Sequence, residues 1–180
     1  MNLDGDLTID RVFLTAGKAF RSAETAEVGA LLGSMLCDIG NAFSGRVTFG
    51  AEEAVWMLEI MEQALVRGTN AQSADRTMLD ALHPAVIAAQ ESENEDIVEV
   101  LRRAGEAASD GARDSRMLSR LGSGCQNGDQ TLGHGDSGAK CMALILRSLE
   151  ESVTALKATR GTSERTDCRF VSKTTSTFDG

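Results

Sequence analysis

Residues 51–68, AEEAVWMLEIMEQALVRG, decide the fold class of this chain of 180 residues. Apolar side chains recur every three or four positions along the segment, which is the spacing of one face of an α-helix. They are Ala54, Met57, Leu58, Met61 and Leu65. Gly68, directly after the basic Arg67, stands where a helix usually ends. The segment therefore predicts an amphipathic helix that packs one face on a core.

The same spacing recurs on both sides of this segment, and it predicts one or two helices before it and three after it. The predicted helices lie over residues 9–35, over a stretch that begins at residue 76, and over residues 97–118 and 139–156. Aromatic residues make up 4% of the chain, Tyr is absent and Pro occurs once. Because Ala, Leu and Met favour helix over strand, we predict an all-α fold.

Local signals predict where these helices begin and end. Asp75 can cap the helix that follows it, and Pro84 predicts a bend or a restart in that helix. The acidic run 91–96 suits the positive end of the next helix, so it is interpreted as a solvated terminus. Small residues at 40–45 predict a break, and the glycine-rich segment 122–138 predicts a loop.

The length fits one domain, which we place at residues 1–156. Residues 157–180 are rich in Thr, Ser, Arg and Asp and lack helical periodicity, which predicts a polar, disordered tail. No segment has the pattern of a membrane span or of a secretory leader, so the expected location is cytoplasmic. The four cysteines lack CxxC spacing and are interpreted as buried thiols. A net charge of −9 disfavours binding to nucleic acid.

Two loops contain residues that could bind a metal ion or a phosphate. Asp4 and Asp6, followed by Asp10, place three carboxylates just before a helix, and oxygen ligands of this kind suit Mg²⁺. A solvated acidic N-terminus remains an open alternative. A calcium EF-hand fits less well, because Ile9 stands where that loop needs Gly and Thr15 where it needs Glu. The segment 40–45, GNAFSG, could receive a phosphate ahead of a helix or be only a turn. The chain has no Walker A motif and no GxGxxG motif.

Two further segments point to a family. Arg67 and Gly68, followed by DRTMLDALHPA over residues 75–85, and later LGHGDSGA over residues 132–139, occur in this order after the acidic loop. They resemble two signatures of the nucleotide-binding L subunit (DhaL-type) of dihydroxyacetone kinase, RG…GDRTMLDALxPA and SIGHxDPGA. The resemblance covers residues 3 to 150. It implies an antiparallel, up-and-down barrel or bundle of about six to eight helices that holds ADP or ATP through Mg²⁺ at one end.

The resemblance also implies site residues. Asp4 and Asp6 match two of three metal-binding aspartates, and Asp10 stands where the family has a nucleotide-contacting Asn. Positions expected to contact the nucleotide are Asp10, Ala42, Ser44, Gly68, Thr77, Met78, Asp136, Ser137 and Gly138. The catalytic residues stay unassigned. His134, although part of a signature, is interpreted as a structural residue of its loop.

Several positions depart from the family pattern. The first metal aspartate is missing, which we interpret as a truncated N-terminus. A His-Gly pair of the family is replaced here by Leu7 and Thr8. In the glycine-rich loop, Ser123 stands where the family has an Arg, and Gln130 replaces another residue of the family pattern. Loss of an Arg beside a phosphoryl group can lower the rate of transfer by orders of magnitude.

The sequence leaves two function hypotheses open. The first is an enzyme subunit that presents a phosphoryl group to dihydroxyacetone or a related ketose, which a separate sugar-binding subunit (DhaK-type) holds. A phosphocarrier protein could recharge its ADP, and a homodimer is possible in either case. The second is a degenerate relative without catalysis that serves as a partner-binding helical module.

Overall fold

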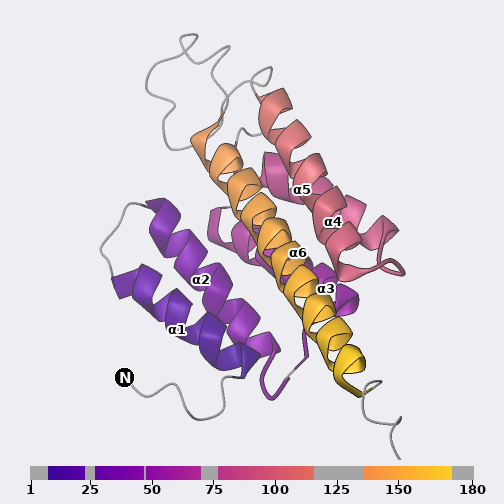
Figure 1. The fold of residues 1–180 in the computed structure, drawn as a ribbon. Coiled ribbons are helices and arrows are strands. Elements are labelled where there is room, and N and C mark those ends of the chain that lie inside the picture. The colour runs from indigo at the N-terminus through magenta and orange to yellow at the C-terminus, as the bar shows by residue number, and fades with distance from the viewer. Residues whose placement is uncertain (1–7, 23–26, 47, 70–76, 116–135, 172–180) are drawn as a thin grey trace, which may run out of the picture.

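The computed structural model describes residues 8–22, 27–46, 48–69, 77–115 and 136–171 of the chain. These residues form six helices and no strand, so the fold is all-helical as predicted (Figure 1). The helices are α1 (Ile9–Ser22), α2 (Glu27–Ala42), α3 (Ala51–Thr69), α4 (Leu79–Glu91), α5 (Ile97–Asp114) and α6 (Ser137–Val171).

The core is built from the predicted apolar stripes. On α3, Leu58 and Leu65 are almost fully buried, together with the other stripe residues Ala54, Met57 and Met61. They meet buried Leu, Val and Ala side chains of α4 and α5, and Ala139, Met142 and Leu146 of α6. The helical spacing read from the sequence is therefore confirmed for α3, α5 and the first half of α6.

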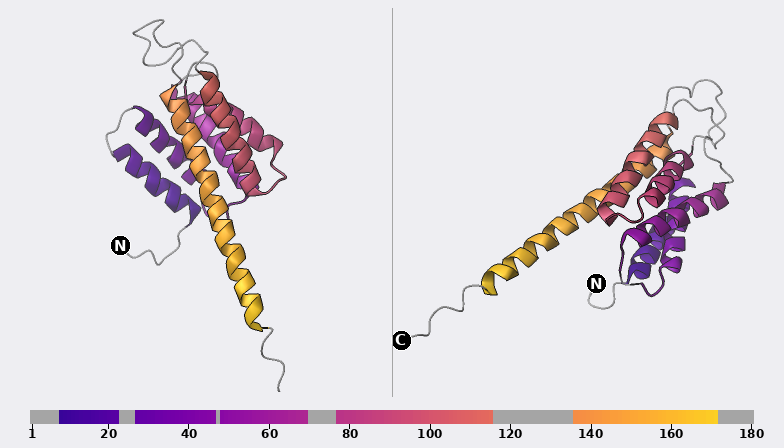
Figure 2. Two further views of the ribbon diagram at one scale, coloured as in Figure 1. Left: turned by 45° about the horizontal axis from the view of Figure 1, so that its top comes forward. Right: turned by 90° about the vertical axis from the view of Figure 1, so that its right-hand side faces the viewer.

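Successive helices pack on one another along the chain, and α6 returns to pack on α5 and α4. The views in Figures 1 and 2 show α1 and α2 as a hairpin on one side of the molecule, with α4 and α5 on the other. Because each helix reverses the direction of the one before it, the starts of α1, α3 and α5 lie at one end. The starts of α2, α4 and α6 lie at the opposite end (Figure 1).

Residues 36–42 belong to α2, although the sequence predicted a break from Gly40. The reason is a close approach of α1, because a Cβ on Gly40 would lie 2.7 Å from Leu14 Cγ. Glycine is therefore needed there for packing and not for a turn. The turn comes at Gly45, whose φ of 76° favours glycine, in the four-residue turn closed by the Arg46 N–H and the Phe43 carbonyl.

Pro84 lies inside α4, which continues through it. The sequence predicted a bend or a restart at Pro84, and the prediction of a restart was wrong. Proline removes the N–H that would bond the Asp80 carbonyl. That carbonyl faces Gly111 of α5, where an added Cβ would lie only 2.0 Å from the Asp80 oxygen. The missing side chain at Gly111 thus lets α5 approach α4 at the proline. The predicted cap Asp75 lies outside the described residues.

The backbone of α6 continues to Val171, past residue 156, where the sequence predicted that helical structure would end. Ala155, Lys157 and Ala158 are good helix formers, so local propensity continues the helix where apolar periodicity stops. In Figure 2 this part of α6 projects beyond the other helices. The division into a domain at 1–156 and a tail at 157–180 stays a prediction. Within the described residues, no helix combines the length and the apolar character that a membrane span requires.

Candidate functional site

The N-termini of α4 and α6 meet at one end of the molecule, and they bring together five of the predicted nucleotide-contacting residues. Met78, only 5% exposed, lies against Gly138, where an added Cβ would be 2.8 Å from Met78 Cγ. Thr77 lies two residues before α4, Asp136 lies directly before α6, and Ser137 is the first residue of α6. We refer to these five residues as the α4–α6 end.

Both helices at this end are capped by their own side chains. The Thr77 hydroxyl accepts a hydrogen bond from the Leu79 N–H at 3.2 Å, and the buried Asp80 carboxylate accepts one from the Thr77 N–H at 2.8 Å. On α6, Asp136 Oδ1 accepts the Ala139 N–H at 2.9 Å. These bonds satisfy some of the free N–H groups and fix the directions in which the remaining ones point.

Ser115 joins this end to α5 and was not singled out from the sequence. Its hydroxyl accepts the Asp136 N–H at 3.2 Å and donates to the Ala112 carbonyl at 2.8 Å. The side chain is fully buried. Ser115 lay inside the helix predicted over residues 97–118, so nothing in the sequence marked it as the residue that follows α5. Gly68 lies near the end of α3, where an added Cβ would meet Leu31 Cδ2 at 2.8 Å, so its nearest neighbour belongs to α2.

Asp10, Ala42 and Ser44 lie together at the start of α1 and the end of α2, which we call the α1–α2 end. The Ile9 N–H donates to the Arg46 carbonyl at 3.4 Å and holds the two helix ends together. The Thr8 hydroxyl, and then the N–H groups of Arg11 and Gly45, lower the pKa of Asp10. Asp10 Oδ1 is buried and accepts no hydrogen bond. A carboxylate oxygen with a free lone pair fits the ligand preference of Mg²⁺ or a donor group on a ligand.

The two groups lie at opposite ends of the molecule. α2 runs between them, and its 16 residues span about 24 Å at the usual rise per residue. The resemblance implied a single pocket, and within the described residues one chain does not form it. Asp4 and Asp6, like Leu7, Ser123, Gln130 and His134, lie outside the described residues. Among the residues that the structure does describe, no three His, Cys, Asp or Glu side chains gather in a way that could hold a metal ion.

A cleft of about 620 Å³ adjoins the α1–α2 end. Arg46, Trp56 and Glu53 line it, with the guanidinium carbon of Arg46 5.1 Å from the Trp56 ring centre and its Nη1 2.6 Å from Glu53 Oε1. The Gly50 N–H, followed by Arg46, lowers the pKa of Glu53. Trp56 and Phe43 pack 4.9 Å apart between ring centres. The aromatic residues were scattered in the sequence, so this cluster could not be predicted from spacing.

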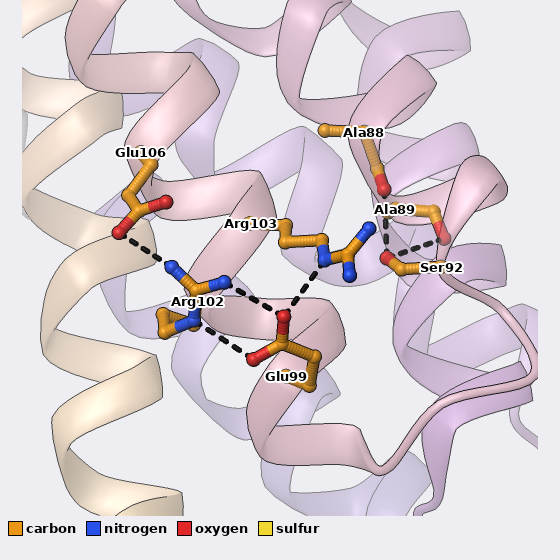
Figure 3. Close-up of polar contacts among 7 residues, drawn as sticks. All are labelled: Ala88, Ala89, Ser92, Glu99, Arg102, Arg103 and Glu106. Atoms are coloured by element: carbon orange, nitrogen blue, oxygen red, sulfur yellow. Dashed lines mark hydrogen bonds and ion pairs between the residues drawn. The ribbon is translucent and has the colours of Figure 1, made fainter.

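The exposed face of α5 carries a network of charged side chains (Figure 3). Arg102 bonds both Glu99 and Glu106, and Arg103 bonds Glu99 at 2.8 Å. These two arginines, Arg102 first, lower the pKa of Glu99 to about 2. Figure 3 also shows Ser92 donating to the Ala88 and Ala89 carbonyls at the end of α4. Balanced charges that satisfy one another on one helix are typical of a solvated face.

Residues 2–151 match the DAK2 domain family, and the chain belongs to that family. Two relatives come from Mycolicibacterium smegmatis. An L-erythrulose 1-kinase is 30% identical over 146 residues, which cover 78% of this chain and 25% of the relative. A D-erythrulose kinase is 28% identical over 153 residues, 79% of this chain and 25% of the relative. The chain thus spans about a quarter of the length of these curated relatives.

Two solved structures share the fold. The dihydroxyacetone kinase from C. freundii in complex with AMP-PNP and Mg²⁺ aligns with a TM-score of 0.56 and 24% identity, over 81% of this chain and 23% of that one. The native form of that kinase aligns with a TM-score of 0.55 and 24% identity, over 81% and 24%. The helical arrangement described above is therefore the one found in part of a larger kinase.

Proposed function

We propose that this chain is the ADP- or ATP-binding and Mg²⁺-binding part of a ketose kinase, which presents the phosphoryl group to dihydroxyacetone or a related ketose. Membership of the DAK2 domain family and the two erythrulose kinases among the relatives support the proposal. Since the chain spans only about a quarter of those kinases, the ketose would be held outside these 180 residues, by a separate sugar-binding subunit or by a sugar-binding domain.

The observation that carries the proposal is the meeting of two helix N-termini at the α4–α6 end. Met78 and Gly138 are in contact there, and the two helix dipoles both direct positive potential toward the same end of the molecule. Free N–H groups at such a point suit a nucleotide phosphate or the polar edge of its base. Thr77, Asp136 and Ser137 are the other positions of this end at which the resemblance expects nucleotide contact.

The α1–α2 end would bind the nucleotide phosphates and the Mg²⁺ ion. Ser44 is exposed in the turn after α2, and the free Oδ1 of Asp10 lies beside that turn. Asp4 and Asp6 precede Thr8 in the sequence and are the proposed Mg²⁺ ligands. Mg²⁺ bound there would offset negative charge on the phosphates. This chain's own contribution is to bind and orient the nucleotide, because no residue in it is proposed as a nucleophile.

The separation of the two ends favours a second candidate, a helical module that binds a protein partner without catalysis. A single chain that cannot place both groups around one nucleotide would bind it weakly or not at all. The cationic Arg expected in the glycine-rich loop is also replaced, by Ser123.

Calorimetric titration of the purified chain with ADP, with and without Mg²⁺, tests the proposal. We expect saturable binding that requires Mg²⁺ and that disappears in Asp6→Ala. The matched control Asp114→Ala, an exposed carboxylate on α5, should bind as the natural chain does. Absence of heat at millimolar nucleotide in the natural chain would reject the proposal in favour of the second candidate.

A further inference from the structure

α4 and α5 are each followed by a serine whose side chain is fully buried, and the two serines make different contacts. The Ser92 hydroxyl, after α4, donates to the Ala88 and Ala89 carbonyls of that helix (Figure 3). The Ser115 hydroxyl, after α5, donates to the Ala112 carbonyl at 2.8 Å. A buried hydroxyl needs such a partner, since leaving it unpaired costs free energy. Both serines therefore satisfy carbonyl groups at the end of a helix.

Ser115 also makes a contact outside its own helix. Its Oγ accepts the Asp136 N–H at 3.2 Å, although the two residues are 21 positions apart in the chain. Asp136 lies directly before α6 and caps it, because Asp136 Oδ1 accepts the Ala139 N–H at 2.9 Å. A hydroxyl can donate one hydrogen bond while its oxygen accepts others. Ser115 thus links the last turn of α5 to the start of α6 through a single oxygen atom.

The N–H groups at the start of α6 are of two kinds. Those of Asp136, Ala139 and Lys140 donate to oxygen atoms of the protein. Those of Ser137 and Gly138, which lie between them, have no acceptor among the described residues. Free N–H groups in the first turn of a helix suit an anionic or hydrogen-bond-accepting group of a ligand. The bonded groups on both sides determine where these two free groups point.

We propose that Ser115 is a positioning residue of the nucleotide site, which fixes the start of α6 by accepting the Asp136 N–H. The inference rests on the proposed function, because the free N–H groups concerned belong to the α4–α6 end. Since its side chain is fully buried, Ser115 acts through Asp136 and not by contact with the nucleotide. A serine that only ended α5 would need no contact beyond those that Ser92 makes.

The Asp136 amide tests the positioning without a nucleotide. In Ser115→Ala this amide loses its acceptor, so its resonance should shift and its hydrogen exchange should become about tenfold faster. Ser92→Ala, which removes an equally buried serine from the end of α4, is the matched control and should leave the Asp136 amide unchanged. An Asp136 amide that is the same in Ser115→Ala as in the natural chain would overturn the proposal.

Calorimetric titration with ADP and Mg²⁺ tests the consequence for binding. Ser115→Ala should bind about threefold to tenfold more weakly than the natural chain, the range expected when one hydrogen-bond acceptor is lost. Ser92→Ala should keep the natural affinity, although urea unfolding should show a similar loss of stability in both variants. Equal affinities of the two variants, whether natural or reduced, would show that Ser115 contributes only to stability and would overturn the proposal.

The two measurements separate this inference from the proposed function. A natural chain that binds no ADP at millimolar concentration rejects the proposed function, and the Asp136 amide still decides whether Ser115 holds the start of α6. Binding by the natural chain that is unchanged in Ser115→Ala keeps the proposed function and rejects the positioning role of Ser115.

Discussion

Gly111 sets the distance between α4 and α5. Its missing Cβ leaves room for the Asp80 carbonyl, which Pro84 has deprived of its helical donor. Gly138 has a similar role at the candidate site, where it lets α6 begin directly against Met78. The two glycines show how single residues position whole helices in this fold.

Gly111→Ala should destabilise the chain by about 1–3 kcal/mol, the usual cost of overpacking, because a Cβ would lie 2.0 Å from a backbone oxygen. Gly105→Ala is the matched control on the same helix, since its nearest neighbours would be 3.8 Å away. It should leave stability unchanged or raise it slightly. Urea unfolding followed by circular dichroism measures both variants. Equal midpoints for the two variants would contradict the packing described for Gly111.

Gly138→Ala should weaken ADP binding about tenfold, which corresponds to about 1.4 kcal/mol. An added methyl group would displace Met78 and crowd Asp136 Oδ1, which lies 3.0 Å from the ideal Cβ position. Gly105→Ala, away from both ends, should keep the natural affinity. Titration calorimetry compares them, and an unchanged affinity for Gly138→Ala would remove the α4–α6 end from the nucleotide site.

At the scale of the elements, the caps and the helix lengths decide which residues share an end. Asp96 caps α5 by accepting the Val98 N–H at 2.8 Å, and the same carboxylate pairs with Lys157 of α6. This exposed ion pair joins α6 to the start of α5. The cap and the ion pair can be separated by substitution, because Asn caps a helix but carries no charge.

Asp96→Ala should lower stability by about 1 kcal/mol through loss of the cap, and Asp96→Asn should lower it less. Lys157, and then the Val98 N–H, lower the pKa of Asp96 below its ordinary value of 3.8. A lowered pKa in the folded state means that the charged form stabilises the fold above pH 3.8 and that this contribution is lost as the pH falls further. Thermal unfolding between pH 2 and pH 6 checks this. A natural chain and an Asp96→Asn variant with the same pH dependence would contradict it.

The sequence predicted the elements better than it predicted the site. Periodicity reports the local conformation, so the buried stripe of α3 and the start of α5 could be read directly. Gly40 was misread because its close contact with α1 is a tertiary feature that no local pattern reveals. The position of Asp10 relative to Met78 depends on how many times the chain reverses between them. The sequence left open whether one or two helices precede α3, and that choice changes the number of reversals.

For the whole molecule, the arrangement of the motifs matters more than their presence. The chain belongs to the DAK2 domain family and has the fold of part of a dihydroxyacetone kinase. Its matched loops nevertheless lie at two opposite ends of one chain.

The central claim is that an adenine nucleotide binds at the α4–α6 end, and the amide resonances of the ¹⁵N-labelled chain test it most directly. Addition of ADP with Mg²⁺ should shift the amide of Gly138 at this end, with a saturable midpoint. The amide of Gly105 should not move. No shift of Gly138 at millimolar ADP would contradict the claim.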